Sequence, residues 1–434
     1  MKYKWNCHRF VSCTGLILAV AMIGTGCGSK YIDYAQDAEV EDIAAANDIF
    51  DVEQYNPHIF VNQADYELDD EKLVFFEGGK ERALFNVVRK SDNVVVFKGR
   101  TQPVSNMDVY LSKGSFTTLT DAGTYYIETD SLGISRDFVI KENAYDELFN
   151  GILQNISVFE PDNSIEGICD TSFGMYMILY SMQCNDAKYS EQLVPVIKYL
   201  TDYLLSNQNE NGSIYNDYEA TAAACGIIAL SCDMLSNYET DKMLIDKYNI
   251  AADNAWSWLE KSDCDNGSKK SARFFAAASL FKSNGDEIYR AIMDNYLKSD
   301  VHIYETYGYG ENQFAFYGAL TYLTLNKGIE RNICNNIVKS LVNRVEQLCE
   351  AAKKDTAFET GIKGVDENMS NLLLLGFANY IAPSREYKEI IRNIIQYMGG
   401  LNETGECYIN SDGMLSEKKL EWNGIILFAF DEAK

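Results

Sequence analysis

Residues 59–140 alternate between apolar and polar positions with a period of two, as strands do when one face is buried. Glycine-containing turns, such as Glu77-Gly78-Gly79-Lys80, separate the apolar runs. The pattern predicts seven strands, at 59–61, 73–76, 84–88, 94–97, 107–111, 125–128 and 136–140. Seven strands within about 85 residues are typical of a two-sheet, immunoglobulin-like β-sandwich.

After Ile140 the apolar positions recur with helical spacing to the end of the chain. The pattern predicts twelve helices, at 144–159, 171–184, 190–208, 218–236, 241–262, 267–283, 286–298, 311–325, 331–350, 366–381, 385–398 and 418–430. Twelve helices suit an (α/α)6 toroid, in which six inner helices line a funnel and six amphipathic helices surround them. Composition alone also allows an irregular helical bundle.

The first 26 residues have the pattern of a bacterial lipoprotein signal peptide. Lys2, Lys4 and Arg9 precede an apolar run from Val11 to Ile23, and small residues then lead to Cys27. We expect Cys27 to carry a lipid that anchors the protein at the extracellular face of the bacterial cell membrane. A transmembrane anchor is the alternative, although the apolar run is short for a span.

The mature chain is expected to have three parts. Residues 27–56 are acidic and rich in alanine, so we interpret them as a tether. The sandwich follows at 57–141 and the helical domain at 142–434. Two domains are consistent with a length of 434 residues, 47% of them hydrophobic.

The charge and cysteine content exclude several classes of function. A formal net charge of −26 disfavours nucleic acid and anionic lipid surfaces as partners, but not a neutral polysaccharide or oligosaccharide. Three of the eleven cysteines are Cys7, Cys13 and Cys27, and the other eight are scattered without metal-ligand spacing. We therefore expect no cofactor and no readable metal site, and leave a structural calcium ion open.

Three motifs of the sandwich resemble a known family. They are Val61-Asn62-Gln63-Ala64-Asp65-Tyr66, Asp121-Ala122-Gly123-Thr124-Tyr125-Tyr126-Ile127, and Phe138-Val139-Ile140 leading into Tyr145-Asp146-Glu147-Leu148. Their order and spacing are similar to the N-terminal immunoglobulin-like domain of family 9 glycoside hydrolases, which are cellulase-like enzymes. This chain has Asp65 where that family has glycine, and Ala122 where it often has proline.

The helical half continues the resemblance. The segment from Ile394 to Tyr408 is similar to the family's Gly-x-Asn segment, and Ser416-Glu417-Lys418-Lys419-Leu420-Glu421-Trp422-Asn423 aligns without a gap on the family motif Asn-Glu-Val-Ala-Ile-Asp-Trp-Asn. The resemblance implies that Glu417 is the general acid that protonates the departing sugar. On local pattern alone, Glu417 is equally a favourable charge at a helix N-terminus.

An inverting glycosidase also needs a carboxylate that activates water. Where the family supplies a pair of aspartates, this chain has Cys169 and Ser172, with Asp170 one residue out of register. Asp170 is our candidate base, and Asp162 and Glu166 are the other acids within reach. The alternative role for Asp170 is a helix N-cap.

Aromatic residues complete the candidate site. Tyr307 and Tyr309 lie in a glycine-broken stretch suited to stacking on sugar rings, and Trp422 and Tyr408 belong to the motifs above. Two functions follow. The first is a surface-anchored hydrolase of β-1,4-glucan or related oligosaccharides acting by inversion. The second is a catalytically inactive relative that binds glycans or has a structural role at the cell surface.

Overall fold

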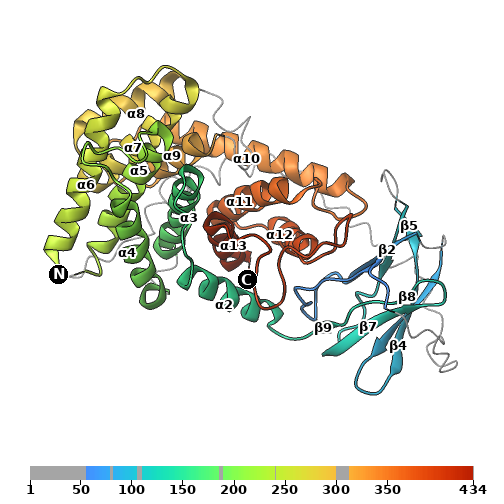
Figure 1. The fold of residues 1–434 in the computed structure, drawn as a ribbon. Helices are drawn as coiled ribbons and strands as arrows, with labels where there is room; N and C mark the ends of the chain where they lie inside the picture. Colours follow the sequence, from blue (N-terminus) through green and yellow to red (C-terminus); the bar gives the residue numbers. More distant parts are fainter. Residues whose placement is uncertain are drawn as a thin grey trace.

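The computed structural model describes residues 55–433 except 79–81, 105–109, 185–188, 240 and 300–311. Figure 1 shows a β-sandwich followed by a larger assembly of helices, with the short segment between β9 and α2 connecting the two. The two parts predicted from the sequence periodicities are confirmed.

The sandwich consists of two antiparallel sheets. One has the strand order β1-β2-β6-β5, and the other has the order β4-β3-β7-β8 with β9 also paired to β7. The strands are β1 (Ile59–Phe60), β2 (Leu73–Glu77), β3 (Leu84–Arg89), β4 (Val94–Arg100), β5 (Gln102–Pro103), β6 (Leu111–Ser115), β7 (Gly123–Thr129), β8 (Gly133–Ile134) and β9 (Phe138–Ile140). Tyr66 lies in the core between the sheets, edge-on to Phe116 and Phe138 at 5.6 Å. The strand expected at 107–111 falls largely outside the described residues.

The helices alternate between the centre and the outside of a ring. Helices α3 (Ile165–Cys184), α5 (Tyr218–Leu235), α7 (Gly267–Asn284), α9 (Gln313–Leu323), α11 (Val365–Ile381) and α13 (Leu420–Ala433) are central and apolar on nearly all faces. Helices α2 (Ala144–Ser157), α4 (Ser190–Ser206), α6 (Lys242–Lys261), α8 (Glu287–Ser299), α10 (Arg331–Lys354) and α12 (Arg385–Met398) bury one face only. This alternation confirms the predicted (α/α)6 toroid. Helix α5 is apolar and long enough to cross a membrane, but 83% of it is buried, as in a core helix.

Aromatic side chains fill the centre of the ring. Tyr176 of α3 packs against Tyr317 of α9 with ring centroids 4.5 Å apart, and Phe316 of α9 lies 5.7 Å from Phe377 of α11. Helix α13 packs against both α11 and α3, so it lies between them in the ring. The middle of the ring is therefore a packed core, and a ligand has to approach from one of its ends.

Helix α3 begins six residues earlier than the pattern predicts, at Ile165 instead of Thr171. The helix begins there because Ser164 caps it: its Oγ accepts the N–H of Gly167 at 2.9 Å, and its carbonyl accepts the N–H of Ile168 at 3.0 Å. The preceding loop also packs tightly on the first turn. A Cβ placed on Gly167 would lie 2.1 Å from the carbonyl oxygen of Asp162, so only glycine permits this approach. As a result, Glu166 lies on the helix and not on the preceding loop, and Asp170 lies in the second turn, where it cannot be the N-cap of α3.

The sandwich is joined to the helical domain by backbone contacts. The N–H of Gln63 donates to the carbonyl of Gly399 at 2.7 Å, and the N–H of Ser411 donates to the carbonyl of Gln63 at 2.9 Å. Phe75 and Phe358 extend the sandwich core across the interface, with ring centroids 5.0 Å apart. These contacts fix the position of the sandwich beside the helices.

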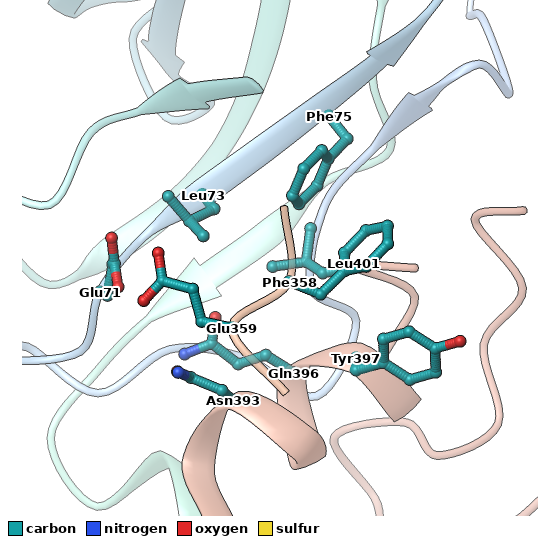
Figure 2. A pocket seen from close by; sticks show the side chains of 9 residues that line it. All are labelled: Glu71, Leu73, Phe75, Phe358, Glu359, Asn393, Gln396, Tyr397 and Leu401. Carbon is teal, nitrogen blue, oxygen red and sulfur yellow. The ribbon is translucent and has the colours of Figure 1, made fainter. Parts of the chain in front are cut away.

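A small pocket lies in this interface. Figure 2 shows two carboxyl groups in it, from Glu71 of the sandwich and Glu359 of the helical domain, beside apolar side chains that include Leu73. The two carboxyl groups share a hydrogen bond, and burial together with the charge of Glu359 raises the pKa of Glu71 to about 7. Lys113 offsets part of the negative charge of Glu359, because its ammonium lies 3.2 Å from the Glu359 carboxyl group.

Candidate functional site

The N-terminal ends of the central helices meet on one side of the ring. Gln313, the first residue of α9, donates to Glu421 near the start of α13, and Ser268 of α7 donates to Glu219 of α5 at 2.6 Å. Asp170 of α3 contacts the start of α13. We call this side, where the first two turns of the central helices lie, the N-terminal face. It carries most of the candidate residues that the structure describes.

Asp170 holds the first turn of α13. Its Oδ2 accepts the N–H of Leu420 at 2.9 Å, and its Oδ1 accepts the N–H of Glu421 at 3.1 Å. Helix N-termini present such unpaired N–H groups, and a carboxylate there also opposes the helix dipole favourably. Burial raises the pKa of the Asp170 carboxyl, although the two N–H groups act in the opposite direction. Asp170 therefore has the capping function proposed as the alternative, but for a helix 250 residues later in the chain.

Glu421 is a buried acid that the sequence reasoning did not select. Glu421 is only 2% exposed, yet its carboxyl group accepts three hydrogen bonds from two side chains. The amide of Gln313 donates to both carboxyl oxygens at 2.9 and 2.8 Å, and the hydroxyl of Tyr317 donates to Oε1 at 2.7 Å. Burial, reinforced by the charge of Asp170, raises the pKa of Glu421 to about 8. At neutral pH the Glu421 side chain is therefore mainly a neutral acid.

Glu417 lies outside this buried network. Its side chain is 50% exposed, and one of its oxygens lies 2.9 Å from the ammonium of Lys419. The same ammonium interacts electrostatically with Asp170 and Asp366. Lys419 thus connects the exposed acid to the carboxylates of the N-terminal face.

The aromatic candidates occupy different environments. Trp422 is fully buried in the helical core, and the ammonium of Lys419 lies 5.2 Å from the centroid of its ring. Tyr408 is partly exposed and donates to Glu406 at 3.1 Å. Trp422 therefore has no face open to a sugar, while Tyr408 does. Tyr307, Tyr309 and Cys27 lie outside the described residues.

The structure thus brings Asp170 together with Glu421, and Lys419 interacts with both Asp170 and the exposed Glu417. The two alternative acids lie on either side of the start of α3: Glu166 is on its first turn, and Asp162 precedes it. Glu421 could have been identified from the sequence as an acid at the second position of a mainly apolar helix. Such a residue is rarely buried without a partner.

Among the described residues, no group of three or more His, Cys, Asp or Glu side chains is arranged to hold a metal ion. The eight cysteines outside the leader are not in disulfide bonds, and four of them are buried and four partly buried. Burial raises the pKa of the Cys225 thiol, as expected of a cysteine that serves as a small apolar side chain.

Comparison with known proteins agrees with this architecture. Residues 54–133 match the family described as the cellulase N-terminal ig-like domain. No curated protein matches the sequence. Among solved structures, a metagenome-derived family 9 endoglucanase matches with a TM-score of 0.69 and 15% identity, covering 86% of this chain and 98% of that chain. The chain has the fold of the family 9 glycoside hydrolases.

Two further structures support the family 9 fold. A family 9 protein from Bacteroides ovatus matches with a TM-score of 0.66 and 16% identity, over 88% of this chain and 99% of that one. The structure of AaCel9A in complex with a cellobiose-like isofagomine matches with a TM-score of 0.62 and 17% identity, over 81% of this chain and 84% of that one. The family 9 fold thus extends through both the sandwich and the toroid of this chain.

Proposed function

We propose that this chain is a glycan-binding protein built on the family 9 fold, which recognises β-1,4-glucan or related oligosaccharides at its N-terminal face without hydrolysing them. The main observation behind this proposal is the position of Asp170, whose two carboxyl oxygens both accept N–H groups of α13. The fold and the cellobiose-like ligand of AaCel9A support a glucan as the ligand class. The net charge of −26 favours a neutral ligand over an anionic one.

We expect no hydrolysis because the buried acids already accept hydrogen bonds from groups of the protein itself. A base in an inverting mechanism has to face the substrate and accept a proton from water. Asp170 instead faces the start of α13, and Glu421 is enclosed by Gln313 and Tyr317. Cys169 and Ser172 stand at the positions that align with the aspartates of family 9. A neutral thiol or hydroxyl at these positions cannot replace a carboxylate as the base.

A second candidate function is hydrolysis with Glu417 as the general acid, and one observation favours it. Glu417 is exposed beside the N-terminal face, within a motif that aligns without a gap on that of the hydrolases. Glu417 would protonate the departing sugar oxygen while a second carboxylate, roughly 6.5–9.5 Å away, activated a water molecule. Lys419 would then have to leave Glu417 when substrate binds.

One experiment separates the two functions. Binding of cellohexaose is measured by calorimetry, and release of reducing ends is measured on the same samples, for the wild type and for Glu417→Gln. We expect both proteins to bind and neither to release sugar above the blank. Turnover by the wild type that Glu417→Gln abolishes would establish the second candidate. A wild type that neither binds nor cleaves would refute both.

We also propose that the mature protein is attached to the outer face of the cell membrane through a lipid on Cys27. The leader pattern supports this proposal, because it places a cysteine directly after the apolar run. The full chain and a Cys27→Ser variant are expressed in bacteria supplied with a palmitate analogue. We expect label and detergent-phase partitioning for the wild type only; equal labelling of the variant would exclude this anchor.

A further inference from the structure

Three tyrosines lie together beside the N-terminal face. Tyr199 and Tyr203 come from α4, and Tyr215 comes from the loop that leads into α5. Tyr199 is 51% exposed and Tyr215 is 39% exposed, so both offer ring surface to solvent. Tyr203 is partly buried between them and interacts electrostatically with both. We call these three residues the tyrosine patch.

The patch is continuous with the N-terminal face. The hydroxyl of Tyr203 donates to the carbonyl of Asp162 at 2.6 Å. That carbonyl lies against Gly167, where an added Cβ would approach it to 2.1 Å. Gly167 precedes Asp170 by three residues on α3, or about one helical turn. A ligand on the N-terminal face that extends past the start of α3 therefore reaches the patch.

The loop that carries Tyr215 is held in place. Tyr215 and Asn216 have φ angles of 51° and 53°, and the N–H of Asp217 donates to the carbonyl of Ile214 at 2.9 Å. Two successive residues with positive φ form a tight type I′ turn. Its usual residues are asparagine and glycine, and a tyrosine there costs about 1–2 kcal/mol. The Tyr215 hydroxyl donates to Asn207 at 2.6 Å, which fixes the ring.

The chemistry of the patch fits a neutral sugar chain. Tyrosine rings present flat apolar faces with a polar edge, which match the faces and hydroxyls of a pyranose. Because hydrogen bonds hold the rings of Tyr203 and Tyr215, binding requires little further ordering of these two side chains. The net charge of −26 opposes an anionic ligand on the same surface.

We propose that the tyrosine patch is an accessory sugar-stacking site, which extends the glycan-binding surface from the N-terminal face onto α4 and the α4–α5 loop. This proposal rests on the proposed function, because it assigns part of the same glucan chain to these tyrosines. The ligand it predicts is an oligosaccharide long enough to reach both surfaces.

The test compares Tyr199→Ala and Tyr215→Ala with Tyr238→Ala. Tyr238 is a matched control: it is 38% exposed and follows the opposite end of α5. We expect each patch variant to weaken the binding of cellohexaose about five- to tenfold, and the control to leave it unchanged. Tyr215→Asn keeps a residue that tolerates positive φ, so it removes the ring without disturbing the turn. We expect it to match Tyr215→Ala.

The outcomes also distinguish this proposal from the proposed function. If the wild type binds cellohexaose and all variants match it within twofold, the patch is not a sugar site and the proposed function stands. If the wild type does not bind, both proposals fail. If the wild type dimerises and Tyr215→Asn abolishes dimerisation without changing sugar binding, the patch is an interface between copies of this chain, which overturns the proposal.

Discussion

Replacing Glu421 with glutamine tests the conclusion that a buried neutral acid holds α13 to α9. Glutamine has nearly the shape of the protonated acid and keeps an oxygen to accept from Tyr317. Its amide nitrogen can donate to the side-chain oxygen of Gln313 once that amide rotates. At pH 5, where Glu421 is protonated, we expect the variant to lie within about 1 kcal/mol of the wild type in stability.

The difference between the two proteins should grow as the pH rises. The pKa of Glu421 is about 8 in the folded protein because of burial, against an ordinary value of 4.5 for a glutamic acid. Because the folded state raises the pKa of this carboxyl, protonated Glu421 stabilises the fold fully below the pKa of the unfolded chain. This stabilisation is lost as the pH rises through the pKa of the folded protein. At about 1.4 kcal/mol per pKa unit, ionising Glu421 costs the folded state on the order of 5 kcal/mol between pH 4.5 and 8. Glutamine cannot ionise, so the variant does not lose this stability.

The measurement is urea denaturation of both proteins from pH 5 to pH 8.5. We expect the free energy of unfolding of Glu421→Gln to exceed that of the wild type by several kcal/mol at pH 8.5. Glu417→Gln is the control, because it makes the same change four residues earlier at a half-exposed carboxylate. A difference between Glu421→Gln and the wild type that stays constant with pH would refute the reasoning.

Three further predictions concern the packing of the helices and the domain interface. Asp170→Ala leaves two N–H groups of α13 without their acceptor, so it should lower the free energy of unfolding, measured in urea, by about 2 kcal/mol. Asp170→Asn should recover about half of this loss. Equal losses in the two variants would contradict the capping role of Asp170. Gly174→Ala would place a Cβ 2.5 Å from Leu420 Cγ, and should lower the thermal midpoint although alanine favours helix; an unchanged midpoint would contradict this close packing. Wild-type protein should be cut faster between its domains by a protease at pH 8 than at pH 6, because the pKa of Glu71 is about 7 and its ionisation repels Glu359. Glu71→Gln should remove this pH dependence, and equal cutting of the wild type at both pH values would contradict it.

The fold could be predicted from the sequence because its signals are local. A period of two identified the sandwich, and a helical period identified twelve helices within a few residues of their observed ends. The largest error was the start of α3, which the pattern placed at Thr171 and the structure places at Ile165, after the capping residue Ser164.

The site could be predicted only in part, because its contacts join distant segments. Asp170 was selected from its position near a family motif, but its partners Leu420 and Glu421 lie 250 residues away. Nothing near Glu421 in sequence indicates that Gln313 and Tyr317 will enclose it. The assignment of Glu417 as general acid stays a prediction, since it rests on the motif, and the exposure of that side chain is consistent with either function.

The surroundings of Cys169 oppose a charged side chain at this position. Burial raises the pKa of its thiol to about 12, and the charges of Asp217, Glu219 and Asp170 add to this effect. The same burial and the same charges would raise the pKa of an aspartate placed there. The electrostatics of the N-terminal face therefore favour a neutral side chain at this position, as the proposed function requires.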